Sequence, residues 1–179
     1  MPAVLLLCVG LTGEGARGQW NTTSQADVQA VYLYNFAKFV RWPNGKTDAS
    51  FDICVAGPKL YLDVLGKVVA DQRIDGRPIA VRAVVNPEDE NGCDILFLDA
   101  SLGGRGDVLL TATAGKPILT VSDSDGFLRR GGMVQFLLIE NHVRFSVNLV
   151  PVEKNGIELS SELLKVAVNV QGRPRRGAP

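Results

Sequence analysis

The alternation of short apolar segments with helical segments between residues 51 and 121 constrains the fold of this chain more than any other sequence feature. The apolar segments have the length and composition of β-strands, and they cover residues 51–57, 79–85, 94–99 and 118–121. Two further segments have helical periodicity, residues 59–70 and 105–114. Strands that are apolar throughout are buried on both faces, which requires helices on both sides of a largely parallel sheet. We therefore predict an α/β fold in one domain, a size that suits a chain of 179 residues.

The C-terminal third has a different pattern, which is typical of a β-hairpin followed by a helix. Two β-rich runs, residues 133–139 and 142–149, are separated by Glu140-Asn141. In the second run apolar residues alternate with polar ones, so one face should pack inward while the other meets solvent or a partner. A last helix is predicted from an N-cap at Ser160 to about Val170. Its expected apolar face consists of Leu163, Leu164, Ala167 and Val168.

A first helix is predicted before the sheet, over residues 24–41. Ser24 and Asp27 have the spacing of a capping box, and Trp42-Pro43 should end the helix. Its expected apolar face consists of Val28, Val31, Tyr32, Phe36, Phe39 and Val40.

The two ends of the chain are predicted to lie outside the domain. Residues 1–18 resemble a secretory signal peptide, and the lack of a Lys or Arg before the apolar run is consistent with a truncated leader. The apolar run is shorter than the roughly 20 residues that span a membrane. We predict export to the periplasm, a linker at residues 19–23, a domain over residues 24–170, and a disordered basic tail at residues 171–179.

Composition and motifs argue against several classes of function. Nineteen basic and nineteen acidic residues balance, so no net field would attract nucleic acid or an anionic membrane. One histidine and three cysteines are too few for a typical zinc site, and His142 has no evident nucleophile to activate. The glycines of residues 103–106 fit neither a P-loop nor a dinucleotide motif, and residues 123–126 lack most ligands of a calcium loop. We predict no catalytic residue, metal or cofactor.

Cys54 lies within the first core strand, and Cys93 immediately precedes another. Neighbouring strands could bring the two thiols within bonding distance, and an exported protein would ordinarily pair them. Closing a loop of about 40 residues would add about 4 kcal/mol of stability in the chain-entropy model. The alternative is two buried free thiols, as in a cytosolic protein.

Several of these segments together resemble the YfiR family of periplasmic proteins. The resemblance rests on YLYNFAKFVRWP at residues 32–43, CVAG at Cys54, CDILFLD at Cys93, LTVSDSDGFLRRGGMVQFLLIENHVRFSVNL at residues 119–149, and the LSSELLKVA segment. It implies a periplasmic α/β protein, usually a homodimer, that binds the periplasmic sensor domain of a membrane diguanylate cyclase and restrains it. Cys54 and Cys93 match the family's disulfide. Some relatives have a second disulfide within residues 128–135, where this chain has no cysteine.

The resemblance also places a partner-contact surface toward the hairpin and the last helix. On this chain it suggests Val134, Phe136, Ser146 and Val152, and relatives often have an acidic residue where Ser146 stands. The resulting hypothesis is a regulatory binding protein, not an enzyme, that lowers cyclic di-GMP signalling. The alternative is an exported protein that binds a small ligand and acts with another membrane partner, such as a sensor kinase or receptor. An enzyme of flavodoxin-like architecture would need a cofactor site that the sequence does not offer.

Overall fold

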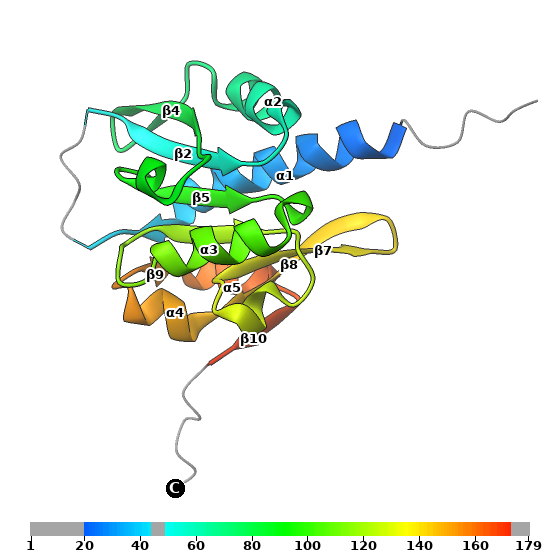
Figure 1. The fold of residues 1–179 in the computed structure, drawn as a ribbon, viewed down its shortest axis with the longest axis vertical. Helices are drawn as coiled ribbons and strands as arrows, with labels where there is room; N and C mark the ends of the chain where they lie inside the picture. The colour runs from blue at the N-terminus through cyan, green and yellow to red at the C-terminus, as the bar shows by residue number, and fades with distance from the viewer. Residues whose placement is uncertain (1–19, 44–48, 173–179) are drawn as a thin grey trace, which may run out of the picture.

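The fold is built on one central sheet, which confirms the predicted α/β class. A computed structural model describes residues 20–43 and 49–172 (Figure 1); the predicted leader and nearly all of the basic tail lie outside these ranges. The main sheet has the strand order β10-β8-β7-β6-β5-β2-β4-β3. Its strands are β2 (Phe51–Ala56), β3 (Arg73–Ile74), β4 (Arg77–Ala83), β5 (Ile95–Leu98), β6 (Leu119–Ser122), β7 (Val134–Ile139), β8 (His142–Asn148) and β10 (Asn169–Gln171).

The five strands from β4 to β7 in this order are parallel to one another, as predicted. β8 runs antiparallel to β7, and the turn between them uses Glu140 and Asn141, both with positive φ. This confirms the predicted hairpin. β3 pairs with only two residues of β4, and β1 (Val40–Arg41) forms a separate short pair with β9 (Glu158–Leu159). None of β1, β3, β9 and β10 was expected from the sequence, because strands of two or three residues have too few positions for a pattern.

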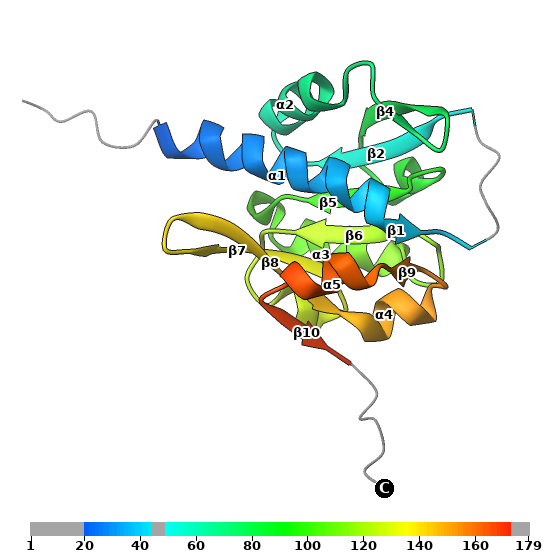
Figure 2. The same cartoon turned by 180° about the vertical axis from the view of Figure 1, so that it is seen from behind.

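Helices cover both faces of the sheet, so the central strands face two cores. Figure 2 shows α1 (Trp20–Phe39) and α5 (Ser161–Val166) across one face, with α2 (Lys59–Val69) beside α1; α3 (Gly104–Ala112) lies across the opposite face (Figure 1). α4 (Leu149–Lys154) contacts β9 and β10. Three short 3-10 helices, η1 (Pro87–Glu90), η2 (Ala100–Leu102) and η3 (Phe127–Arg130), complete the fold. Ile53 and Val55 of β2 enter the larger core under α1, whereas Cys54 and Ala56 enter the smaller one.

The buried face of α1 differs from the predicted one. Phe36 and Val40 are buried as expected, but Val28, Val31 and Phe39 are 43%, 46% and 41% exposed. The residues that α1 instead turns toward the core are mostly small: Ala26, Gln29, Ala30, Leu33 and Ala37. Alanines allow the helix to lie close to its neighbours, and this contact outweighs the hydrophobicity of the valines. The helix also begins at Trp20, before the predicted cap at Ser24.

The last helix is shorter than predicted. Ser160 caps α5 as expected, since its Oγ accepts a hydrogen bond from the Leu163 amide at 3.2 Å. The helix then ends at Val166, and residues 169–171 form β10, parallel to β8. The amide of Val168 donates to the carbonyl of Phe145 at 2.9 Å. The prediction of a helix to Val170 was therefore wrong, because the free edge of β8 offers hydrogen bonds to a valine-rich segment that favours the extended conformation.

Within residues 20–43 and 49–172, no helix combines the length and apolar character that crossing a membrane would require.

Candidate functional site

Cys54 and Cys93 form a disulfide, which confirms their predicted pairing. Their Cα atoms lie 5.9 Å apart, and both side chains are fully buried in the smaller core. The bond ties β2 to the loop that precedes β5, because Cys93 is the second residue before that strand. It therefore fixes the centre of the sheet and offers no exposed sulfur.

Arg82 holds the same loop by non-covalent contacts. Its guanidinium pairs with Asp52 (Nε to Oδ2, 2.6 Å) and donates from Nη2 to the carbonyl of Asn91 at 2.9 Å. Nη2 also lies 3.5 Å from the sulfur of Cys93. Asp89 adds a capping box with Asn86, and the amides of Asn86 and Val85 lower the pKa of its carboxyl group. The loop around the disulfide is thus held by backbone and side-chain contacts as well as by the covalent bond.

The four residues predicted to contact a partner are all buried. Val134 and Phe136 on β7, Ser146 on β8 and Val152 on α4 are 0%, 2%, 6% and 1% exposed. The three apolar residues belong to the larger core, and Ser146 lies opposite Gln135 in the hairpin. Contact of these side chains with a partner stays a prediction. In this structure the four side chains pack beneath the surface of the molecule.

Four exposed apolar side chains belong instead to two elements at one end of the molecule. The β7–β8 hairpin extends past the sheet on the side where α1 begins, as both views show (Figures 1 and 2). Leu138 and Ile139 on the hairpin are 59% and 42% exposed, and Val28 and Val31 on α1 are exposed as well. Between the two elements lies a cavity of 240 Å³, the hairpin-end groove, lined by Gln25, Val28, Tyr32, Leu138, Asn141, His142, Val143 and Arg144.

Aromatic packing fixes the base of this groove. The ring of Tyr32 lies 5.6 Å from that of Phe145 and 5.8 Å from that of Phe136, measured between centroids. The hydroxyl of Tyr32 also reaches the carbonyl of Val143 at 3.4 Å. α1 and the hairpin are therefore held together, and the groove between them has a defined shape. Sequence reasoning missed this site because it assigned Val28 and Val31 to the core.

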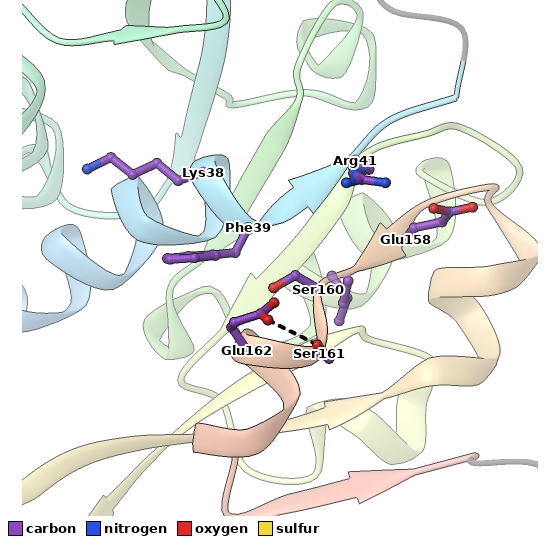
Figure 3. Close-up of a pocket in the computed structure, with 8 residues that line it drawn as sticks. Lys38, Phe39, Arg41, Glu158, Ser160, Ser161 and Glu162 are labelled. Carbon is purple, nitrogen blue, oxygen red and sulfur yellow. Dashed lines mark hydrogen bonds between the residues drawn. The ribbon is translucent and has the colours of Figure 1, made fainter.

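A second cavity, of 430 Å³, lies at the other end of α1 (Figure 3). Its walls come from the end of α1, the β1–β9 pair and the start of α5, and Arg41 and Glu158 occupy opposite positions in that pair. The carboxyl group of Glu162 has a lowered pKa, because its own backbone amide and the Ser161 hydroxyl donate to it. This α1–β9 pocket is lined by Lys38, Phe39, Arg41, Glu158, Leu159, Ser160, Ser161 and Glu162. It offers both positive and negative groups to a polar ligand.

A third group of side chains lies at the carboxyl ends of the parallel strands, where open α/β sheets commonly bind ligands. Asp99 follows β5, Asp123 follows β6, and Tyr61 and Gln29 approach them from α2 and α1. Gly57 follows β2, where a Cβ atom would come within 2.6 Å of the Asp99 Cβ. In the described ranges, no three His, Cys, Asp or Glu side chains are grouped so that they could hold a metal ion.

Comparison with known proteins relates this chain to a protein family and to solved structures. A model of the YfiR/HmsC-like family matches residues 26–168 of this chain. A crystal structure of a conserved domain protein from Vibrio cholerae O1 biovar El Tor str. N16961 superposes with a TM-score of 0.55 at 12% sequence identity. The match covers 82% of this chain and 60% of that protein's chain. At this identity the solved structure supports the fold alone.

Proposed function

Because the chain belongs to the YfiR/HmsC-like family, whose members are periplasmic regulators of diguanylate cyclase signalling, we propose that it restrains a membrane diguanylate cyclase. It would do so by binding the periplasmic sensor domain of that enzyme, which lowers cyclic di-GMP. Such a regulator needs different affinities for two states of its partner, and it needs no catalytic residue. The homodimer that the resemblance implies is part of this proposal.

The observation that carries the proposal is the exposed apolar surface at the hairpin-end groove. Exposed apolar side chains that gather in one place are typical of protein-binding sites, whereas scattered ones are ordinary. The groove joins Val28 on α1 to Leu138 on the hairpin, both exposed, and His142 and Arg144 also line it. We propose that these side chains contact the sensor domain, while the buried Val134 and Phe136 fix the hairpin on which they stand.

Deleting the gene should raise cellular cyclic di-GMP, and complementation with Leu138→Asp should fail to reverse the rise. A charge at the centre of an apolar contact is expected to weaken partner binding by about 2 kcal/mol or more, roughly 30-fold. The matched control is Val108→Asp on α3, because Val108 is 58% exposed and Leu138 is 59% exposed. Cyclic di-GMP is measured by mass spectrometry of cell extracts, with immunoblots to equalise protein levels.

The outcomes of this experiment test the proposed function and the proposed binding surface separately. If deletion leaves cyclic di-GMP unchanged, cyclase restraint is wrong. If deletion raises it and Leu138→Asp complements as well as Val108→Asp does, the function stands and the hairpin-end groove is the wrong surface.

A second candidate function is the binding of a small polar ligand in the α1–β9 pocket. The pocket's volume falls within the range of about 300 to 1,000 Å³ common for ligand sites, and its opposite charges suit a ligand that carries both signs. Ligand binding here would be compatible with restraint of a cyclase, because the pocket lies at the opposite end of α1 from the hairpin-end groove.

Arg41→Ala is expected to abolish any ligand-induced rise in melting temperature, because it removes one of the two cations of the pocket. A thermal-shift screen of purified protein against soluble cell-wall fragments would measure this. Arg144→Ala, which changes the other groove, serves as the matched control and should retain the shift. If both variants lose the ligand-induced shift in melting temperature, the ligand does not bind in the α1–β9 pocket.

A further inference from the structure

The hairpin-end groove combines exposed apolar side chains with a size that suits part of a protein. Val28 of α1 and Leu138 of the hairpin are 43% and 59% exposed, and Tyr32 and Val143 also line the groove. Its volume of 240 Å³ lies below the roughly 300 to 1,000 Å³ of common small-molecule sites. A groove of this size accommodates a few side chains of a protein segment better than a whole metabolite.

Arg144 reaches this groove along the edge of β8. In the hairpin Val143 pairs with Leu138 and Arg144 pairs with Leu137, so the side chains of Val143 and Arg144 leave β8 on opposite faces. The guanidinium returns to the groove, because its Nη1 donates to the carbonyl of Val143 at 3.2 Å. The Tyr32 hydroxyl donates to the same carbonyl at 3.4 Å. A cation and a phenol therefore share one acceptor at the edge of the groove.

No carboxylate in the described part of the chain pairs with Arg144. None of the ion pairs there includes it, and its contact with the Val143 carbonyl is the only hydrogen bond of its side chain there. Asp27 on α1 and Glu140 on the hairpin turn are both exposed, but neither lines the groove. His142, the other basic residue of the lining, contacts the carbonyl of Glu140 through Nδ1 at 2.8 Å. The groove is thus locally positive in a chain whose formal net charge is zero.

A guanidinium at the edge of an apolar groove favours a carboxylate as its partner. Arginine presents its N–H groups in a planar fork that matches the two oxygens of a carboxylate. A bound segment would exclude water from this pair and make it stronger than an ion pair on an open surface. A purely apolar segment would desolvate the cation without compensation, which costs free energy. The groove therefore discriminates in favour of segments that carry an acidic group.

We propose that the hairpin-end groove recognises a protein segment in which a carboxylate lies next to large apolar side chains. Arg144 binds the carboxylate, and Val28 and Leu138 contact the apolar side chains. This inference rests on the proposed function, because it takes the groove as the surface that meets the sensor domain. It adds the chemistry by which the groove selects its partner.

Selection from a random peptide library displayed on phage tests this chemistry without a known partner. Purified protein is the bait, and phage that also bind the Leu138→Asp variant are discarded. The remaining peptides should carry an aspartate or glutamate beside leucine, isoleucine or phenylalanine. Their dissociation constants are then measured with labelled synthetic peptides by fluorescence anisotropy.

Arg144→Ala is expected to raise the Kd of a selected peptide about 10-fold, because it removes hydrogen bonds between two charged groups. Arg129→Ala is the matched control, since Arg129 is an exposed arginine on η3 that does not line the groove. It should leave the Kd unchanged. Added salt should weaken the binding of the wild type more than that of Arg144→Ala.

A charge exchange separates a direct ion pair from a structural role of Arg144. Arg144→Glu should lose the acidic peptide, and a peptide whose acidic residue is replaced by lysine should bind this variant again. A side chain that only shaped the hairpin would give no such rescue.

The inference is refuted if no selected peptide depends on both Leu138 and Arg144, if those that do lack an acidic residue, or if the charge exchange gives no rescue. It is also refuted if Leu138→Asp converts a wild-type dimer into a monomer in light scattering, because a second copy of the chain would then fill the groove. These outcomes leave the effect of gene deletion on cyclic di-GMP untouched. Unchanged cyclic di-GMP on deletion would refute the cyclase as the partner and would leave the peptide specificity of the groove standing.

Discussion

Replacing both Cys54 and Cys93 with alanine is expected to lower the free energy of unfolding by about 4 kcal/mol in the chain-entropy model of a loop of this length. The two residues are 39 positions apart, and the bond closes this loop within the centre of the sheet. A typical domain has about 5 to 15 kcal/mol of stability in total, so the variant should unfold at a much lower urea concentration. Alanine is preferred to serine because both sites are fully buried and a hydroxyl there would need a new partner.

Urea denaturation followed by circular dichroism measures this loss. Wild-type protein that has been reduced and kept under reductant is the control, and it should show the same loss. Arg82 and the capping box of Asp89 still hold the loop without the covalent bond, so the variant should remain folded in the absence of urea. A difference of less than about 1 kcal/mol would mean that the unfolded chain is already restricted in this region.

Phe36→Ala is expected to cost about 3 to 5 kcal/mol, the usual range for removing a buried aromatic side chain. Phe36 is fully buried, and its ring centroid lies 5.1 Å from that of Phe145 and 5.9 Å from that of Phe136. Truncation would leave a cavity between α1 and the hairpin. The loss is measured by urea denaturation at the same protein concentration as the wild type.

Phe39→Ala is the matched control on the same helix. Phe39 is 41% exposed, so its truncation should cost no more than about 1 kcal/mol. The pair also tests the orientation of α1, because the apolar pattern of the sequence assigns both phenylalanines to one face. Equal losses in the two variants would contradict the orientation seen in the structure.

The core of the sheet could be predicted from the sequence because its strands are apolar along their whole length. β2, β5 and β6 lie within one or two residues of their predicted bounds, and the positions of Cys54 within β2 and Cys93 before β5 allowed a disulfide to be predicted, with two free thiols as the alternative. The hairpin could be predicted because Glu140-Asn141 separates two β-rich runs. Each of these features depends on a pattern within a short stretch of consecutive residues.

The surfaces could not be predicted in the same way, because they depend on how the elements pack. The apolar pattern assigned Val28 and Val31 to the core. In the structure the small side chains of Ala26, Ala30 and Ala37 face inward instead. The predicted contact residues on β7, β8 and α4 are buried, and the exposed apolar residues lie next to them on the hairpin. The hydrogen bond between Tyr61 and Gln29 joins residues 32 positions apart, which no local pattern reveals.

The pairing of β1 with β9 has a consequence for the order in which the chain can fold. Val40 pairs with Leu159, so the short strand β1 that follows α1 can form only with residues near the other end of the domain. Phe36 likewise needs Phe136 and Phe145, which are about a hundred residues later in the chain. Contacts between such distant residues form slowly and late, because a long loop must close before they stabilise anything. A partly synthesised chain therefore lacks the core that would lock α1 until the hairpin and β9 have been made.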